Sequence, residues 1–258
     1  MLIVISPAKN LNNNIDNPPK LHSIPDFLAD AQLLVKDLQH LAPQDLAKLM
    51  GISDKLSVLN YDRYQQWHTP FTTDNALPAL LTFNGEVYTG IDAQSFKAAD
   101  YNFAQKHLRI LSGLYGLLRP MDLIQPYRLE MGTRFKNCRG KDLYAFWDDR
   151  LTRTLNQQLK KLKSSTLINL ASNEYFKAVQ SQLLQGDIIT PVFKDWKNDK
   201  YKVISFFAKK ARGLMAAYII KNRLTEPEDL KRFKEAGYRF SKPQSSSHEW
   251  VFTRQKEQ

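Results

Sequence analysis

Two short stretches of the chain contain its whole excess of positive charge. Residues 194–223 carry nine Lys/Arg against two aspartates, and residues 119–141 carry six against one Asp and one Glu. The rest of the chain has equal numbers of basic and acidic side chains, so the formal net charge of +11 comes from these two stretches. Positive charge concentrated in this way attracts polyanions and steers their approach. The sequence therefore predicts a phosphate-bearing partner.

The more basic stretch contains a helix with an unusual charge pattern at its start. Residues 201–207 are β-branched and aromatic and predict a strand, and residues 208–223 predict a helix. The first turn of that helix then holds three cations, which are Lys209, Lys210 and Arg212. Each is unfavourable there by about 0.3–1 kcal/mol unless an anion is bound, and Gly213 adds a helix penalty of about 1 kcal/mol. The pattern favours an anion site; the alternatives are a helix that begins a turn later, or side chains that reach solvent or internal carboxylates.

The other basic stretch follows a predicted strand and contains glycines and prolines that should hold its arginines on fixed turns. The planar guanidinium group matches phosphate or carboxylate in two-point contact. The alternative is internal pairing, for example of Arg128 with Glu130 or Asp122. The glycine spacing matches neither a Walker loop nor a dinucleotide-binding motif, so no nucleotide-triphosphate site is predicted. The candidate anion-binding residues of this stretch are Arg119, Arg128, Arg134 and Lys141.

Residues 166–180 predict a strand, a cap and a helix that brings together a carboxylate, a phenol and an amine: Glu174, Tyr175 and Lys177. Such a group at a strand end is suited to acid–base chemistry, although no partner nucleophile is evident. Helix capping alone explains Ser172 and Asn173. The five histidines and the one cysteine lack metal-ligand spacing, so the sequence predicts no metal site and no cofactor.

Residues 46–60 predict two helices joined by a short turn, a spacing that resembles the helix-hairpin-helix motif. In that motif, backbone N–H groups and a helix N-terminus point at a nucleic-acid phosphate. Gly51 supplies the positive φ of the turn, and Ser53 is placed to cap the second helix. The motif normally has a glycine where Ser53 stands, and Asp54 adds a negative charge, so an ordinary helical hairpin is the alternative. The candidate binding residues of this element are Lys48, Gly51, Ser53 and Lys55.

Alternating strands and helices must position these groups, and they indicate a mixed α/β (α+β) fold with a central mixed sheet surrounded by helices. Strands are predicted at 2–6, 80–84, 108–112, 166–170 and 201–207. Helices are predicted at 24–40, 43–50, 54–66, 142–162 and 208–221. The tail, residues 237–254, predicts two strands joined by a polar loop. We expect one compact domain over 1–258 with a helical insertion near 25–70.

Polar residues follow several of the predicted strands, where ligands gather in open α/β sheets. If the sheet is mostly parallel, these residues line one basic cleft rich in hydroxyl and amide groups. The expected lining is Ser6, Lys9, Asn84, Glu86, Ser112, Tyr115, Ser172, Asn173, Glu174, Lys177, Lys209, Lys210 and Arg212.

The composition limits the class of protein. At 258 residues with 43% hydrophobic content, the chain can bury a substantial core. Its lone cysteine excludes an internal disulfide, the N-terminus has too few apolar residues for a signal peptide, and the longest apolar run, 214–220, is too short to span a membrane. We therefore expect a cytoplasmic protein that does not contact a membrane. Our overall interpretation takes it to be a monomer, although composition does not establish the oligomeric state.

Five segments together resemble the YaaA family, and the similarity extends from end to end. They are SPAKN at 6–10, FNGEVYTGIDA at 83–93, LSGLYGLLRPMDLIQPYRLEMGTR at 111–134, NLASNEYFKAV at 169–179 and KVISFFAKKARGLMAAYIIKNRL at 202–224. The resemblance implies a cytoplasmic protein of the hydrogen-peroxide response that is linked to low free intracellular iron. It also implies DNA binding, a mixed α/β fold, a positively charged cleft and a helix-hairpin-helix element at 46–60. Carried over by position, the cleft would use Lys9, Arg128, Arg134, Lys209, Lys210 and Arg212.

The main hypothesis is a protein that binds duplex or branched DNA through its phosphates with little sequence preference, and that protects DNA or aids its repair under peroxide. The alternative is an enzyme acting on a nucleotide-like or other small anionic ligand in the same cleft. An open groove favours DNA, whereas a narrow pocket that encloses Asn84, Glu174 and Lys177 favours catalysis. A third hypothesis, direct iron sequestration, lacks the necessary ligands.

Overall fold

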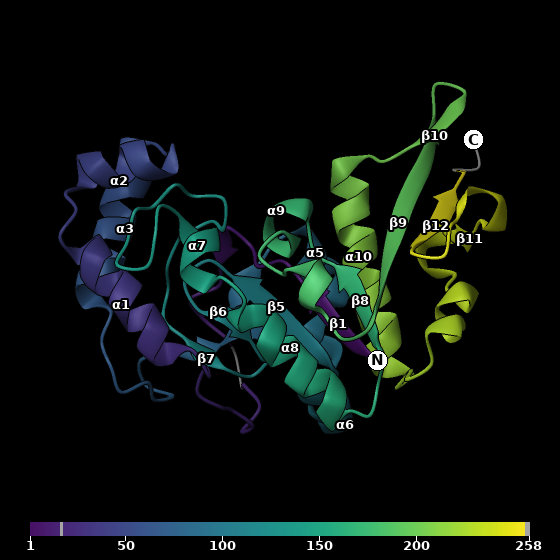
Figure 1. Ribbon diagram of the computed structural model, residues 1–258, viewed down its shortest axis with the longest axis horizontal. Coiled ribbons are helices and arrows are strands. Elements are labelled where there is room, and N and C mark those ends of the chain that lie inside the picture. Colours follow the sequence, from purple (N-terminus) through teal and green to yellow (C-terminus); the bar gives the residue numbers. More distant parts are fainter. Residues whose placement is uncertain (16–17, 256–258) are drawn as a thin grey trace.

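A mixed β-sheet forms the centre of the computed structural model, which describes residues 1–15 and 18–255 (Figure 1). Strands β12, β9, β8, β1 and β5 are parallel to their neighbours in that order, and β11, β10 and β6 pair in the antiparallel sense. Strands β1, β5 and β8 are buried at every position, as is typical of parallel strands covered on both faces. The sheet order is β11 (Arg239–Phe240), β12 (Glu249–Arg254), β9 (Asp187–Lys197), β8 (Thr166–Leu170), β1 (Leu2–Ile5), β5 (Leu108–Ser112) and β6 (Gly116–Leu118), with β10 (Lys200–Lys202) on β9. The predicted mixed α/β class is confirmed.

Helices surround this sheet, and α1, α2 and α3 group at one end of the molecule while β9 to β12 lie at the other (Figure 1). Two short antiparallel pairs join β2 (Asn10–Leu11) to β4 (Phe83–Asn84) and β3 (Leu77–Pro78) to β7 (Leu123–Ile124). The α-helices are α1 (Leu28–Gln39), α2 (Pro43–Met50), α3 (Asp54–Gln66), α4 (Ala79–Thr82), α5 (Glu86–Ile91), α6 (Ala98–His107), α7 (Leu143–Trp147), α8 (Arg150–Lys161), α9 (Asn173–Phe176) and α10 (Ser205–Lys221). The 3-10 helices are η1 (Ala93–Ser95), η2 (Ser181–Leu183), η3 (Pro227–Arg232), η4 (Glu235–Gly237) and η5 (Lys242–Gln244).

Several predicted elements are confirmed and others are wrong. The predicted helices at 43–50 and 54–66 coincide with α2 and α3, and the two tail strands are β11 and β12. The predicted strand at 80–84 is mostly helix α4, and the predicted helix at 142–162 is interrupted at Asp148, where φ is 43°. Strand β9 was not predicted.

The start of α10 is the correction that matters most for function. The predicted strand at 201–207 is wrong, because β10 ends at Lys202 and α10 begins at Ser205. The three cations at 209, 210 and 212 therefore lie beyond the first helical turn. Their supposed conflict with the helix dipole does not exist, so any anion site must rest on what these side chains face.

Helix α10 crosses α5 at very short distance through two glycines. A Cβ atom added to Gly213 would lie 1.9 Å from the carbonyl oxygen of Val87, and one added to Gly90 would lie 2.2 Å from the carbonyl oxygen of Lys210. Close packing against α5 therefore explains why a glycine occupies position 213 in the interior of a helix. Lys209 lies one turn before Gly213 on the same helix face, so this crossing also orients Lys209.

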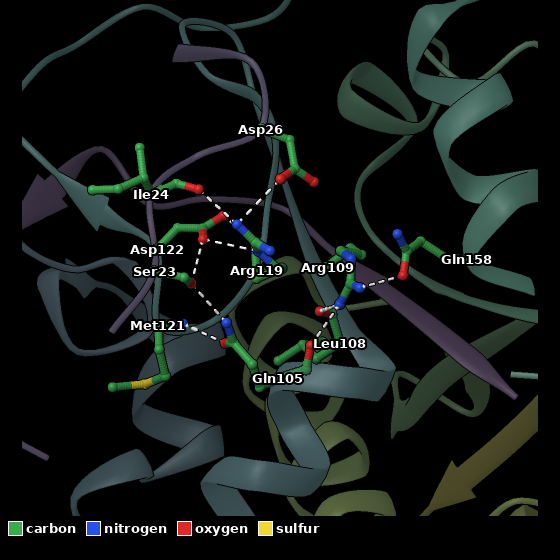
Figure 2. Close-up of polar contacts among 10 residues, drawn as sticks. All are labelled: Ser23, Ile24, Asp26, Gln105, Leu108, Arg109, Arg119, Met121, Asp122 and Gln158. Carbon is green, nitrogen blue, oxygen red and sulfur yellow. Dashed lines mark hydrogen bonds and ion pairs between the residues drawn. The ribbon is translucent and has the colours of Figure 1, made fainter. Parts of the chain in front are cut away.

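A buried polar network holds the N-terminal segment against the loop that follows β6 (Figure 2). The side chain of Asp122 is 1% exposed and accepts hydrogen bonds from Ser23 Oγ at 2.6 Å and Arg119 Nε at 2.9 Å. The Arg119 guanidinium also donates to the carbonyl oxygen of Ile24 at 2.6 Å and pairs with Asp26 at 3.2 Å. Burial raises the pKa of Asp122, while the Ser23 hydrogen bond and the Arg119 cation oppose the rise.

The same network continues to α6, β5 and α8. Gln105 donates to Ser23 Oγ at 2.7 Å and accepts from the Met121 N–H at 2.9 Å (Figure 2). Arg109 is 4% exposed and donates to Gln158 at 2.8 Å and to the carbonyl oxygens of two residues of its own segment. Burial lowers the pKa of Arg109 to about 10. The network thus joins four separate parts of the chain in the interior.

Gly213→Ala should destabilise the protein by about 1–3 kcal/mol, because the added methyl group meets a backbone carbonyl that cannot move aside without shifting α5. Gly51→Ala is the matched control, since open space surrounds that position and only its φ of 60° opposes a side chain; its cost should be about 1 kcal/mol. Urea unfolding measures both. A Gly213→Ala protein more stable than wild type, as helix propensity alone predicts, would contradict the close-crossing argument.

Arg119→Met should destabilise the protein by about 2–3 kcal/mol at neutral pH, because it leaves the Asp122 carboxylate buried without its cation. The pKa of Asp122 then rises further above its unfolded value. A carboxyl with a raised folded-state pKa loses stability as pH rises, so the cost should shrink as pH falls toward the ordinary carboxyl pKa of about 4.

Urea unfolding at pH 7 and pH 5 compares the Arg119→Met protein with wild type. Arg153→Met is the control, because it removes an ion pair with Asp149 in which the arginine is 75% exposed. That change should cost less than about 1 kcal/mol at either pH. An equal cost of Arg119→Met at both pH values would show that Asp122 does not titrate as argued.

Candidate functional site

A cavity of about 490 Å³ opens where the parallel strands β1 and β8 end. The residues after β1 form one side, the β4–α5 segment and α10 form others, and the start of α9 completes the lining. The lining is Ser6, Pro7, Ala8, Lys9, Asn10, Asn84, Gly85, Glu86, Val87, Tyr88, Glu130, Leu170, Ser172, Glu174, Tyr175, Lys209 and Arg212. Eight of the thirteen side chains expected at the strand ends therefore meet around one cavity.

The α10 wall of the cavity carries two cations, Lys209 and Arg212. Within residues 1–15 and 18–255, neither has an ion pair or a side-chain hydrogen bond. Lys209 is exposed, whereas Arg212 is half-buried, and burial lowers the pKa of its guanidinium. A desolvated cation without a counter-charge is stabilised by an anion that enters the cavity.

The opposite side of the cavity has mixed charge. Lys9 Nζ pairs with Glu130 at 2.7 Å, and the other oxygen of Glu130 accepts from Arg128 at 3.1 Å. Glu174 accepts a hydrogen bond from the Gly132 N–H at 2.9 Å. With Glu86, the lining holds three carboxylates and three cations. The cavity is therefore less basic than its two source stretches, and among the described residues its cations without an ion pair, Lys209 and Arg212, both lie on the α10 wall.

Hydroxyl groups tie the two strand ends together at the cavity. Ser6 Oγ accepts from the Ser172 N–H at 2.8 Å and donates to Ser172 Oγ at 3.3 Å, and Tyr88 donates to the Ser6 carbonyl oxygen at 3.0 Å. The Tyr175 phenol is buried, and burial raises its pKa above the ordinary value. Tyr175 is therefore a neutral hydrogen-bond donor and not a ready base. Lys177 lies outside the cavity, over the ring of Tyr144 at 5.0 Å.

A second, more open hollow adjoins the cavity at the turn between α2 and α3. Gly51 has a φ of 60° there, and Ser53 occupies the N-cap position of α3 but makes no side-chain cap hydrogen bond. The hollow has a volume of about 670 Å³ and shares Glu130 and Glu174 with the cavity. It is lined by Lys48, Leu49, Met50, Gly51, Glu130, Gly132, Thr133, Arg134 and Glu174. Lys55 and Ser53 are exposed outside this lining.

The remaining candidate residues do not converge on the cavity. The donors of Arg119 are taken by Asp26, Asp122 and the Ile24 carbonyl oxygen, and Arg128 is 16% exposed and paired with Glu130. Arg119 and Arg128 are therefore paired with carboxylates inside the protein, which is the alternative to anion binding stated above.

Lys141 is exposed and lies outside the cavity and the hollow, and Lys210 lines a different, smaller hollow on α10. The two basic stretches thus meet only in part. At the cavity, residues 119–141 contribute Glu130, and residues 194–223 contribute Lys209 and Arg212.

Some lining residues had no signal of their own in the sequence. Tyr88 and Gly85 follow the segment 80–84, which was predicted as a strand, and Glu130 was considered only as a partner of Arg128. A Cβ at Gly85 would lie 3.2 Å from that of Ala8 on the neighbouring segment, a tight contact that requires a shift of a few tenths of an ångström. Such contacts join segments far apart in sequence, and a single sequence does not indicate them.

Among the residues that the structure describes, no group of three or more His, Cys, Asp or Glu side chains is placed to hold a metal ion. Across the same residues, no helix combines the length and apolar character that crossing a bilayer requires.

Comparison with known proteins gives the chain a family. The family model described as "Peroxide stress protein YaaA" matches residues 1–244. A UPF0246 protein of Teredinibacter turnerae is 62% identical over 254 residues, which cover 98% of this chain and 99% of the relative. A UPF0246 protein of Saccharophagus degradans is 63% identical, over 98% of this chain and 99% of the relative. A UPF0246 protein of Cupriavidus pinatubonensis is 56% identical, over 100% of both chains. The chain is thus a member of the peroxide stress protein YaaA family.

Proposed function

We propose that this peroxide-stress protein is a cytoplasmic monomer that binds duplex or branched DNA through backbone phosphates, with little sequence preference, and protects the DNA or aids its repair. The observation that carries the proposal is a pair of cations on one wall of the cavity, Lys209 and Arg212, which have no ion-pair partner among the described residues. A phosphate in the cavity would supply the counter-charge that these residues lack.

The turn between α2 and α3 supports a second phosphate contact beside the first. The first N–H groups of α3 have no acceptor within the helix, and the Ser53 side chain does not cap them. A helix N-terminus in this state is suited to a phosphate oxygen. Lys48 and Arg134 line the same hollow, and this hollow adjoins the cavity, so one nucleic-acid strand could use both.

A second candidate function is that of an enzyme acting on a nucleotide-like or other small anionic ligand in the cavity alone. A volume of about 490 Å³ is that of an ordinary small-molecule site. Asn84 and Glu174 lie in its lining as the enzyme hypothesis requires, although Lys177 does not. Cations on one wall and carboxylates on another suit a ligand with both a phosphate and hydrogen-bond donors, such as a nucleotide.

The link to low free iron that the family resemblance implies belongs to the same proposal. The described residues offer no cluster of His, Cys, Asp and Glu suited to a metal ion. We therefore propose that any effect on iron follows from the nucleic-acid or anion-binding role and does not proceed by sequestration at a built metal site.

The double variant Lys209→Ala/Arg212→Ala should weaken duplex binding by on the order of tenfold or more at about 0.1 M salt. The slope of log affinity against log salt should fall by roughly 2, since each lost phosphate contact removes about 0.9. The control is Lys160→Ala/Lys161→Ala, which removes the same charge from exposed positions outside the cavity and the hollow. Fluorescence anisotropy with a labelled duplex measures both, and an unchanged affinity and slope in the first variant would show that α10 is not the phosphate surface.

Calorimetric titration with a nucleoside monophosphate and with inorganic phosphate tests the second candidate. The DNA proposal expects weak binding of these small ligands and strong binding of duplex. Tight mononucleotide binding that Lys209→Ala/Arg212→Ala abolishes, in a protein with no measurable affinity for DNA, would replace the first function with the second.

A further inference from the structure

The β9–β10 hairpin projects from the sheet beside the start of α10 (Figure 1). Large apolar side chains of this region are exposed. Trp196 at the end of β9 is 41% exposed, Val203 after β10 is 52% exposed, and Phe206 in the first turn of α10 is 55% exposed. Large apolar side chains gathered at one place on a surface mark a binding site more often than the same residues scattered singly.

These side chains belong to one continuous stripe. The rings of Trp196 and Tyr201 are in edge contact with centroids 4.9 Å apart, and Trp196 lines a hollow of about 210 Å³ with Ile204 and Phe207. Phe207 also lines the next hollow, of about 190 Å³, together with Phe206. The aromatic stripe thus runs from the hairpin to the start of α10.

The geometry of the turn holds Trp196 at the tip of the hairpin. Asn198 and Asp199 both have positive φ, of 53° and 56°, which is the pattern of a two-residue type I′ turn. The turn sets Tyr201 directly opposite Trp196 and Lys200 opposite Lys197. Trp196 is therefore presented by a defined hairpin and not by a loose loop.

The charge around the stripe is strongly positive. Asp195 is buried and bound to Tyr238 and Arg254, which leaves Asp199 as the exposed carboxylate of the segment 194–212. The lysines on the hairpin and the first half of α10 are Lys194, Lys197, Lys200, Lys202, Lys209 and Lys210. Aromatic faces among exposed lysines match a polyanion that also offers flat apolar rings.

We propose that the aromatic stripe binds single-stranded nucleic acid, with Trp196 and Phe206 stacking on unpaired bases and the neighbouring lysines contacting phosphates. Bases in a duplex are already stacked and cannot reach these rings, so the stripe selects unpaired strands. The inference rests on the proposed DNA-binding function. Helix α10 links the two surfaces, because Lys209 and Arg212 face the cavity while Lys210 lines the hollow beside Phe206.

Tryptophan fluorescence tests the stripe directly. Trp67, Trp147 and Trp250 are at most 6% exposed, so quenching by an added ligand reports on Trp196. A short oligothymidylate should quench the wild-type signal in a saturable, salt-sensitive way. Trp196→Phe should keep most of the affinity, measured by anisotropy, and lose the quenching, because phenylalanine can still stack.

Trp196→Ala/Phe206→Ala should reduce affinity for the oligothymidylate by on the order of tenfold and leave duplex affinity unchanged. Leu33→Ala/Leu183→Ala is the control, since both leucines are exposed apolar side chains of α1 and η2, away from the stripe. Thermal melts check that each protein is folded.

The outcomes separate the stripe from the cavity. Loss of single-strand binding in Trp196→Ala/Phe206→Ala supports the stripe, even if Lys209→Ala/Arg212→Ala retains full duplex affinity and the cavity assignment fails. Unchanged single-strand affinity with no quenching overturns the stripe and leaves the cavity proposal standing. Absence of all nucleic-acid binding, with a blue shift of Trp196 on anionic phospholipid vesicles, overturns both and identifies a lipid-binding surface.

Discussion

The contact between Gly90 and Gly213 is the constraint on which the candidate site depends. It brings the backbones of α5 and α10 closer than any side chain allows. Helix α5 follows directly from Asn84 and Gly85, which line the cavity, and α10 supplies Lys209 and Arg212 from the other side. The width of the cavity is therefore set by two backbones in contact, which is a firmer spacer than interleaved side chains.

The electrostatics of the chain are less simple than its net charge suggests. Much of the positive charge in residues 119–141 is used internally: Arg119 binds Asp122 and Asp26, Arg128 binds Glu130, and Arg139 binds Asp30. Among the described residues, the lysines of the β9–β10 hairpin and Lys209, Lys210 and Arg212 of α10 have no ion pair, and the same holds for Arg134 and Lys141. A net charge of +11 attracts polyanions at long range, but the local pairing decides where an anion can be held.

The parallel core and the helical hairpin could be predicted from sequence because their signals are local. The apolar runs of β1, β5 and β8 and the periodicity of α2 and α3, with Gly51 between them, need no distant partner to be recognised. Strand β9 could not, because Pro191 lies within it and its pairing with β12 joins residues about sixty positions apart.

The cavity could be predicted only in outline, from the rule that ligands gather beyond parallel strand ends. The start of α10 was missed because a short aromatic run such as Phe206 and Phe207 fits a strand and a helix equally well. Arg119 pairs with Asp122 only three positions later, but the sequence does not show that Asp122 is buried or that Asp26, about ninety positions earlier, lies beside the same guanidinium. Free and neutralised cations look alike in a sequence, and only the fold separates them.

The placement of cations on two sides of α10 has a consequence for how separate ligands would influence one another. A small anion held by Lys209 and Arg212 makes the electrostatic potential at Lys210 less positive. A second, independent anion would therefore bind more weakly at Lys210, although the two ligands do not touch. A single strand that reaches both sides offsets this penalty, because its second contact forms at high effective concentration. The same helix would thereby disfavour free nucleotides and favour a continuous polymer.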